Sequence, residues 1–312
     1  MSMDFNQALF NITRRAESVT FFLAPMGWGK TRSVWDLAKQ GEKIVFVSPL
    51  RSIIEQLKER DGVAYFREEM TKDKCIDLFL KSKKDNIFLV TPESLSEKIK
   101  QRIMSHNFLF VLDEFHLFYD WGESFREKLF EFYRDLVCEQ RRILGMSASI
   151  TDNLKDKIIE DLGVNNPSVT FIDVGNFEFN NPPAMLISLK DIILKIILWA
   201  HLLFYFKGRM IIFVSTRKCV SIWKERLRQM GIDSHCCVGG EVRDFTQREL
   251  RKNPRIIIST SALSHGVNIV DIKRVFVLYR PEEATIFQMF GRGGRFGESF
   301  KVFTLCKKRA SA

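Results

Sequence analysis

The sequence lacks the features that mark zinc-binding, exported and membrane-spanning proteins. Its six cysteines are scattered and form no C-x-x-C pair, which argues against a structural zinc site and is typical of reduced thiols in a cytosolic protein. The N-terminus, MSMDFNQALF, has acidic and polar residues where a signal peptide would be apolar. The most apolar long segment, residues 186–206, is interrupted by Lys190, Asp191, Lys195 and His201. We therefore expect a well-buried helix there and not a membrane span, in a soluble, intracellular protein without a membrane partner.

The charge balance indicates an anionic partner. The 312 residues include 48 Lys and Arg against 38 Asp and Glu, which gives a formal net charge of +10 at pH 7. A hydrophobic fraction of 46% and a charged fraction of 28% are ordinary for a globular protein and exclude disorder as the main state. The positive excess favours nucleic acid, although many basic proteins bind no polyanion.

Short apolar runs rich in β-branched and aromatic residues alternate with helical patterns along the chain. The expected strands are residues 20–25, 43–49, 86–92, 108–114, 142–149 and the run SVTFIDV in the first half, and 209–216, 234–240, 255–262, 274–281 and 301–306 in the second. Continuous apolar strands alternating with helices predict parallel sheets covered on both faces. The length and the Gly-, Asn- and Pro-rich segment 175–183 predict an α/β fold of two domains, residues 1–178 and 179–312. Ligands of such sheets bind at the carboxyl ends of strands, so we expect a cleft between the domains.

The segment APMGWGKT (24–31) follows an expected strand and precedes an expected helix. It matches the pattern G-x-x-x-x-G-K-[ST] except that Ala24 replaces the first Gly. Small residues such as Gly27 and Gly29 let backbone N–H groups turn toward phosphate oxygens at a helix N-terminus. In this interpretation Lys30 neutralises the β- and γ-phosphates and the Thr31 hydroxyl is a ligand of Mg²⁺. The alternative is a glycine-containing turn with a chance lysine.

Two adjacent carboxylates, Asp113 and Glu114, end the apolar run FLFVL. If this strand ends beside the one that leads into the phosphate loop, Asp113 holds Mg²⁺ and Glu114 orients and deprotonates the attacking water. The inference depends on pairing the carboxylates with Lys30, because a lone Asp-Glu pair is as readily a helix N-cap.

With these residues in place, the chain resembles the superfamily 2 DExH-type helicases and translocases, whose core is two RecA-like domains that close on ATP. The resemblance runs from Ala24 to Arg295 and rests on motifs in the expected order. Motifs I, Ia, Ib, II, III, IV, V and VI correspond to residues 24–31, 48–56, 91–95, 113–116, 147–149, 211–217, 259–269 and 288–295.

The resemblance implies roles for residues in both domains. Arg292 and Arg295 would act as arginine fingers on the γ-phosphate, with Arg295 the first choice, and Gln288 would contact the nucleotide or the attacking water. Gly266 and Asn268 would bring motif V near the nucleotide. Links between the motifs are expected from His116, Ser147 and Ser149, with a packed core histidine as the alternative for His116. Backbone phosphates of the nucleic acid would be bound, without sequence preference, by Ser48, Arg51, Thr91, Ser215, Thr216, Thr260 and Ser261. For each hydroxyl, turn formation or helix capping is the alternative.

The loop after the carboxylates, DEFHLFYDWGESFR, is similar to the D-E-A-H-x-x-x-x-W-G-x-x-F-R pattern of RecQ helicases. In those enzymes this aromatic-rich loop senses single-stranded DNA and couples it to ATP hydrolysis. Here Trp121 would stack on a base, Phe125 would pack or stack, and Arg126 would contact a phosphate or a base plane. The alternative is that Trp121 and Phe125 bury the start of a helix. Two RecQ features differ: only Gln7 is a candidate for the adenine-reading segment, and the zinc-ligand cysteines have no counterpart.

These observations favour an ATP-dependent DNA helicase or translocase that uses ATP and Mg²⁺ and acts on single-stranded or forked DNA. An accessory subunit would be one source of a strand-separating wedge. The nearest alternative is an RNA helicase, since shared backbone-binding motifs do not discriminate between the two nucleic acids. A nucleic-acid-binding or annealing module without efficient turnover is the alternative from another class.

Overall fold

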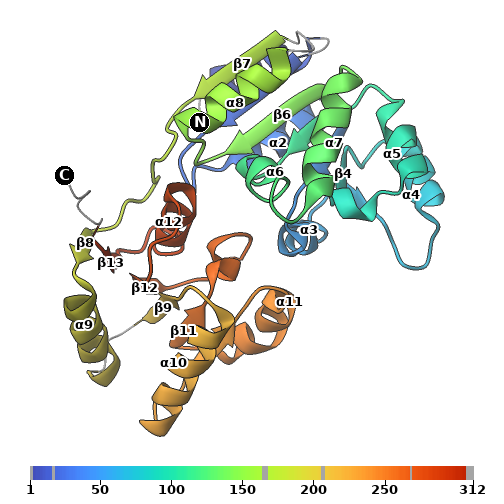
Figure 1. The fold of residues 1–312 in the computed structure, drawn as a ribbon. Coiled ribbons are helices and arrows are strands. Elements are labelled where there is room, and N and C mark those ends of the chain that lie inside the picture. Colours follow the sequence, from blue (N-terminus) through green and yellow to red (C-terminus); the bar gives the residue numbers. More distant parts are fainter. Residues whose placement is uncertain (1–2, 16–17, 164–167, 205–207, 268, 307–312) are drawn as a thin grey trace. The chain divides into compact units, whose positions relative to one another are not determined.

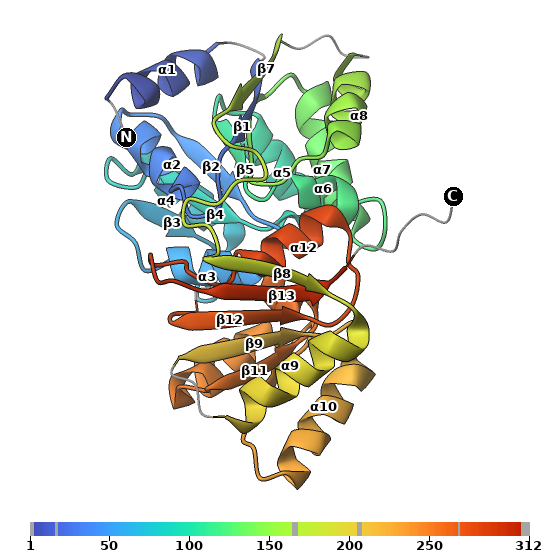
Figure 2. The same ribbon diagram turned by 90° about the vertical axis from the view of Figure 1, so that its left-hand side faces the viewer.

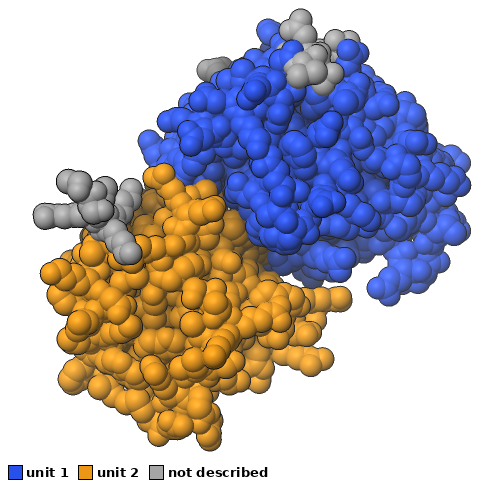
Figure 3. All heavy atoms as spheres, in the orientation of Figure 1, with its two compact units in different colours: residues 1–178 blue, residues 179–312 orange. Residues whose placement is uncertain are grey.

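The computed structural model describes residues 3–15, 18–163, 168–204, 208–267 and 269–306 (Figure 1). The chain forms two compact units, residues 1–178 and 179–312, which are coloured separately in Figure 3. Each unit is an α/β domain built on a parallel sheet (Figure 2). The predicted fold class is confirmed in this respect, because alternating apolar strands and helices form doubly covered parallel sheets in both halves.

The sheet of unit 1 has seven parallel strands in the order β3-β4-β2-β5-β6-β1-β7. Their bounds are β1 (Ser18–Leu23), β2 (Ile44–Val47), β3 (Val63–Tyr65), β4 (Ile87–Val90), β5 (Leu109–Leu112), β6 (Arg142–Ser147) and β7 (Ser168–Asp173). The sequence did not indicate β3. The condition that the strand of the carboxylates ends directly beside the strand of the phosphate loop is not met, because β6 lies between β5 and β1. The residues that follow β6 therefore lie between those that follow β1 and β5.

Helices cover both faces of this sheet. One face packs against α1 (Met3–Thr13), α2 (Lys30–Lys39) and α3 (Arg51–Leu57). The other face packs against α4 (Lys72–Lys81), α5 (Glu97–Met104), α6 (His116–Asp120), α7 (Glu127–Cys138) and α8 (Asp152–Gly163). A short 3-10 helix, η1 (Pro92–Ser94), connects β4 to α5. Alternate residues of each strand enter the two cores, as the period of two of a strand requires.

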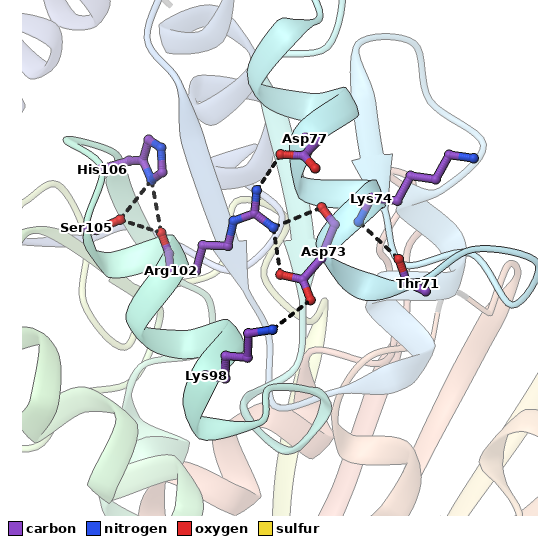
Figure 4. A network of polar contacts seen from close by, with 8 residues as sticks. All are labelled: Thr71, Asp73, Lys74, Asp77, Lys98, Arg102, Ser105 and His106. Atoms are coloured by element: carbon purple, nitrogen blue, oxygen red, sulfur yellow. Dashed lines mark hydrogen bonds and ion pairs between the residues drawn. The ribbon is translucent and has the colours of Figure 1, made fainter.

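A polar network joins α4 to α5 (Figure 4). The guanidinium of Arg102 donates to the Asp73 carboxylate at 2.6 Å and also to Asp77, and Lys98 lies 3.6 Å from Asp73. The hydrogen bond from Arg102 holds the pKa of Asp73 below its usual value. Because these side chains are largely solvent-accessible, the network contributes little to the free energy of unfolding.

The sheet of unit 2 has six parallel strands in the order β10-β11-β9-β12-β13-β8. Their bounds are β8 (Met185–Leu189), β9 (Arg209–Phe213), β10 (His235–Cys237), β11 (Ile256–Ser259), β12 (Ile272–Val277) and β13 (Lys301–Leu305). One face packs against α9 (Asp191–Leu203) and α10 (Arg217–Gln229). The other face packs mainly against the segments α11 (Val242–Asp244), η2 (Phe245–Glu249), η3 (Leu250–Lys252), η4 (Ser261–Ser264) and α12 (Glu283–Phe290).

The prediction of one well-buried helix over residues 186–206 was wrong. Residues 185–189 form β8, which pairs with β13 at the edge of the sheet, and α9 begins at Asp191. Lys190 has an extended backbone and ends the strand just before the helix. Nor is α9 well buried, because Ile192 is 73% exposed and Ile196 is 62% exposed. Within the described residues, none of the helices has the length and hydropathy needed to cross a membrane.

Candidate functional site

The loop between β1 and α2 has the backbone of an anion-binding turn. Gly27 and Gly29 have φ angles of 83° and 102°, in the left-handed region that favours glycine, and Gly29 is the N-cap of α2. The first N–H groups of a helix lack intrahelical acceptors, so they are available to an anion. Ala24, at the position where the pattern has Gly, is fully buried and donates its N–H to Ser147 O at 3.2 Å. A methyl group is therefore accommodated at the start of this loop.

Lys30 extends back over the loop that precedes it. Its ammonium donates to the carbonyl oxygens of Ala24 at 2.9 Å and Pro25 at 3.3 Å. Its charge also acts on Asp113, whose pKa it lowers in opposition to burial. Thr31 follows directly in the first turn of α2. The predicted phosphate-site residues Gly27, Gly29, Lys30 and Thr31 thus lie together at the end of β1.

Asp113 is a buried carboxylate directly after β5. Ser48, which follows β2, lies with its Oγ 3.4 Å from Asp113 Oδ2, so its hydroxyl is turned toward the carboxylate. Burial, followed by the nearby charge of Glu114, raises the pKa of Asp113 to about 7. A bound cation would stabilise the charged form of this carboxylate. Ser48, predicted from motif Ia as a phosphate ligand, is fully buried and contacts the predicted metal ligand instead.

Glu114 has an unusual backbone, with a φ of 47°. A residue other than glycine in this region carries about 1–3 kcal/mol of strain, which is often found at functional sites. Its Oε2 is buried and accepts no hydrogen bond from the described residues. His116 Nδ1 lies 3.7 Å from that oxygen. The carboxylate therefore has a buried oxygen that can still accept a hydrogen bond.

His116 connects motif II to motif III. Its Nδ1 lies 2.9 Å from Ser147 Oγ, and the backbone N–H of Ser149 donates to the same hydroxyl at 3.1 Å. Burial lowers the pKa of His116 and favours the neutral ring. The position of β6 between β5 and β1 is what brings Ser147 to His116. A chain of contacts from Glu114 to Ser149 therefore runs along the carboxyl edge of the sheet.

These residues have the chemistry to hold a nucleotide and Mg²⁺. The loop supplies N–H groups and an ammonium for phosphates, while Thr31 and Asp113 supply the oxygens that Mg²⁺ prefers. Among the described residues there is no cluster of three or more Asp, Glu, His or Cys that holds a metal by itself.

The loop that contains Trp121 is anchored by its arginine. Arg126 Nε donates to Glu93 Oε1 at 2.7 Å, Nη2 pairs with the same carboxylate, and Nη1 donates to Pro49 O at 2.8 Å. The guanidinium also lies 5.3 Å from the centroid of the Trp121 ring. Arg126 thus joins this loop to motif Ia through Pro49 and to motif Ib through Glu93.

The two aromatic residues of the loop differ in exposure. Trp121 is half-buried against the core of unit 1, while Phe125 is 67% exposed, with its ring centroid 5.7 Å from that of Trp121. Gly122 is required by packing, because a Cβ there would lie 2.1 Å from Phe118 O and 2.7 Å from Phe130 Cβ. The loop therefore combines a fixed tryptophan with a phenylalanine ring that faces solvent.

The predicted nucleic-acid residues fall into buried and exposed groups. Thr91 is buried and caps η1 together with Ser94, Thr216 accepts from Cys219 N at 3.2 Å, and Thr260 accepts from Ala262 N at 3.4 Å. Helix capping therefore occupies the Thr216 and Thr260 hydroxyls. The exposed members are Arg51, Ser215, Thr216 and Ser261, and Thr260 is half-buried.

Unit 2 brings its two candidate arginines together. Arg292 Nη1 donates to Val267 O at 2.9 Å, and Arg295 Nη1 lies 3.4 Å from the same carbonyl oxygen. Arg292 is buried and Arg295 is half-exposed, just after α12, which carries the buried Gln288. Val267 follows Gly266, which has a φ of 71°. Motifs V and VI thus meet at one carbonyl group, whereas Asn268 lies outside the described residues.

The glycines of the GRGGR segment are explained by packing. A Cβ on Gly293 would lie 2.1 Å from the Phe300 ring, and one on Gly294 would lie 2.4 Å from it. Phe300 is itself 1% exposed. The pattern R-G-G-R therefore lets the segment turn tightly over an aromatic ring between the two arginines.

Family models match both units. Residues 6–157 match the DEAD/DEAH box helicase family, and residues 190–297 match the helicase conserved C-terminal domain. The chain carries both domains of a superfamily 2 helicase.

Three curated helicases are similar to it at low identity. The mouse (Mus musculus) bifunctional 3'-5' exonuclease/ATP-dependent helicase WRN is 26% identical over 277 residues, which cover 81% of this chain and 19% of that protein. The RecQ-like DNA helicase BLM of Xenopus laevis is 24% identical over 309 residues (89% and 22%). The ATP-dependent RNA helicase DBP4 of Meyerozyma guilliermondii is 24% identical over 307 residues (84% and 40%). The chain thus spans about a fifth to two-fifths of the length of these relatives.

The helicase fold is also that of a solved structure. The structure of S. cerevisiae Dbp5 bound to RNA and ADP BeF3 aligns with a TM-score of 0.67 at 16% identity, covering 93% of this chain and 80% of that one. The prediction of two RecA-like domains is confirmed. The relatives and this structure include a DNA helicase, an RNA helicase and an RNA complex, so the type of nucleic acid is not decided by similarity.

Two contacts of this chain were not expected from the sequence. Glu93 lies in the segment that corresponds to motif Ib, where the resemblance implies a role for Thr91 alone. The sequence held one sign of this contact. A carboxylate such as Glu93, in a segment expected to face phosphates, needs a cationic side chain nearby. The carbonyl group of Pro49 gave no signal at all, because side-chain patterns do not show where a backbone acceptor lies.

Proposed function

We propose that the chain is an ATP-dependent DNA helicase or translocase that hydrolyses ATP with Mg²⁺ to move along or unwind a nucleic-acid strand. The observation that carries the proposal is the placement of Lys30, Asp113 and Glu114 at the carboxyl edge of one parallel sheet. The motif order of a superfamily 2 helicase supports it.

In this proposal the residues of unit 1 have separate roles in phosphate binding, Mg²⁺ binding and activation of the attacking water. The loop N–H groups and Lys30 bind phosphate oxygens, and Thr31 and Asp113 hold Mg²⁺, which supplies charge neutralisation when bound. Glu114, with its buried oxygen still able to accept, orients a water molecule and takes its proton. His116, whose Nδ1 lies 2.9 Å from Ser147 Oγ, links the segment of Glu114 to motif III.

Arg292 and Arg295 of unit 2 supply cationic groups to the γ-phosphate when the two domains close on ATP. Arg295 is the stronger candidate for the arginine finger, because it is half-exposed while Arg292 is buried and bonded to Val267 O. Gln288, on the preceding helix, contacts the nucleotide or the attacking water in this proposal.

DNA is proposed over RNA because of the loop after motif II. Its residues Trp121, Phe125 and Arg126 match the RecQ pattern, and the RecQ-like BLM is named a DNA helicase. The exposed Phe125 ring and the Trp121 ring offer stacking surfaces for bases, a contact worth about 1–3 kcal/mol per base. The RNA helicase among the relatives keeps an RNA substrate as the second candidate.

The test is ATP turnover with and without matched nucleic acids. We expect stimulation by single-stranded and forked DNA that exceeds stimulation by RNA of the same length and sequence. Stronger stimulation by RNA would replace the DNA proposal with the RNA one, and tight strand binding without turnover would favour an annealing module. Lys30→Ala is expected to abolish turnover, whereas the control Lys39→Ala, on the same helix with a side chain 76% exposed, retains it. A strand-displacement assay on forked DNA separates unwinding from translocation alone.

A further inference from the structure

Helix α9 is apolar on two opposite sides. Its inner side places Leu194, Leu198 and Leu202 in the core of unit 2, where each is at most 3% exposed. Its outer side carries Ile192 and Ile196, which remain mostly exposed. A helix that is apolar all round is ordinarily buried all round. Figure 2 shows α9 on one face of the sheet of unit 2, beside α10. The outer side is therefore a candidate interface.

The apolar residues on the outer side follow the spacing of a helix–helix seam. Ile192, Ile196, Trp199 and Leu203 are separated by four, three and four residues, which is the a/d spacing at which two helices pack knobs into holes. Leu203 is 60% exposed, and Trp199 is half-buried with its ring centroid 5.5 Å from that of Trp223 on α10. The Trp199 ring thus packs against α10, and its exposed part contributes to the seam.

This seam is self-complementary. Spacing of four, three and four reads the same in both directions, so an antiparallel copy places Ile192 opposite Leu203 and Ile196 opposite Trp199. A two-fold interface requires this kind of exchange, in which residue i contacts j and j contacts i. In the same register Lys195 faces Ala200, so no like charges are opposed. The Lys195 charge is also balanced within its own helix by Asp191, at 2.6 Å.

The exposed area agrees with what a stable dimer needs. Five large apolar side chains of α9 and its C-terminal end are exposed by 45–73%, namely Ile192, Ile193, Ile196, Leu203 and Phe204. Ile192, Ile196 and Leu203 belong to the seam, and Ile193 and Phe204 flank it. At about 100 Å² for each exposed side chain, the five supply ~500 Å² of apolar surface. A standard interface takes about 800 Å² from each partner, and in homodimers about 65% of it is apolar, or ~520 Å².

From this seam we propose that the chain forms a two-fold homodimer through antiparallel packing of α9 against α9 of a second copy. The occupant is a second copy because the spacing, the opposed residues and the area all match the seam to itself. In this dimer the two chains meet through unit 2. The interface lies on the face of the sheet that carries α9, whereas η4 and α12, which contain residues of motifs V and VI, pack on the opposite face.

The test uses the full chain and light scattering coupled to size exclusion over a range of concentrations. We expect a mass of twice the 36.4 kDa chain for the wild type. Ile196→Glu and Leu203→Glu are each expected to give the single-chain mass, since both side chains are exposed and the core does not depend on them. Ile159→Glu is the matched control, because Ile159 is an isoleucine 53% exposed on α8 of unit 1, and we expect it to remain dimeric.

A mixing experiment identifies the partner surface. Residue 196 lies near the two-fold axis, so Ile196→Glu and Ile196→Lys are each expected to be single chains, while an equimolar mixture recovers the dimer through opposite charges. Thermal melts of both variants establish that each is folded. A wild type of single-chain mass at all concentrations, or a dimer that persists in Ile196→Glu and Leu203→Glu, would overturn the proposal. Failure of the mixture to recover the dimer would overturn the antiparallel α9 pairing.

Discussion

Removal of the Arg126 side chain is expected to loosen unit 1 and, through it, the response to a nucleic-acid strand. The guanidinium bridges Glu93 and Pro49 O, and both charged side chains are less than a third exposed, at 22% for Arg126 and 25% for Glu93. The bridge joins three segments that follow three different strands, namely β2, β4 and β5. Its loss therefore affects how motifs Ia and Ib are held relative to the aromatic loop.

The magnitude follows from the contacts. A hydrogen bond to a charged group contributes about 1.5–3 kcal/mol, and a partly buried carboxylate that loses its partner adds its own desolvation cost. We expect Arg126→Ala to lower the free energy of unfolding of unit 1 by ~3 kcal/mol. The double-mutant cycle with Glu93→Ala is expected to give a coupling energy of ~1–2 kcal/mol. Arg126→Lys should rescue little, because an ammonium group cannot reproduce the planar fork that reaches both acceptors.

Urea unfolding followed by circular dichroism and tryptophan fluorescence measures these energies, and DNA-stimulated ATP turnover is measured on the same variants. The matched control is Arg134→Ala, an exposed arginine on α7, for which we expect a change within about 0.5 kcal/mol. A coupling energy near zero, together with a loss confined to DNA stimulation, would refute the bridging role. That result would restore the role predicted from the sequence, in which Arg126 contacts the phosphate or base of the strand directly.

Four other outcomes are expected. Arg295→Ala should reduce kcat at least tenfold with little change in nucleotide Kd, measured by turnover and by fluorescent-nucleotide binding; an equal loss of binding would exclude the finger role. Trp121→Ala should reduce DNA-stimulated turnover more than basal turnover, and equal losses in the two assays would favour a packing role alone. Gly122→Ala should destabilise unit 1 by more than about 3 kcal/mol in urea, because its Cβ would lie 2.1 Å from Phe118 O; wild-type stability would show that the turn adapts. Burial lowers the pKa of His201 from 6.5, so the unfolded state binds more protons than the folded state below that pH. The free energy of unfolding of unit 2 should therefore fall as the pH falls from 7 toward 5. His201→Gln should reduce this pH dependence, and an unchanged dependence of the free energy on pH would assign it to other groups.

Much of the fold follows from local patterns. Buried strands such as β2, β5 and β9 are continuous apolar runs between turn residues, so their type and parallel arrangement were predictable. The edge strand β8 was not, because its residues run into α9 through one apolar stretch with only Lys190 and Asp191 between them. The three residues of β3 are too few to show a pattern, whereas the equally short β10 was predicted from the longer run 234–240.

Candidate site residues could be identified from the sequence where residue type and spacing together indicate one kind of chemistry. Lys30, Asp113 and Glu114 have few other uses in that order, whereas the hydroxyl groups have several. Ser48 and Thr260 show why, since a hydroxyl serves a carboxylate or a helix end as readily as a phosphate, and only the fold decides which is near. Strand order decides this too, because it is β6 that brings Ser147 to His116.

The position of β1 between β6 and β7 also has a consequence for synthesis of the chain. Val19 pairs with Ile143 and with Val169, so neither neighbour of β1 has been made when the strand leaves the ribosome. Pairing so distant in sequence is slow to form, because a long loop must close before the contacts stabilise it. The β2, β4 and β5 strands, which lie closer in sequence, can pair earlier. The loop proposed to bind the nucleotide follows β1 and is thus completed among the last parts of unit 1. A nascent chain would gain this proposed phosphate site only when the rest of that domain is in place.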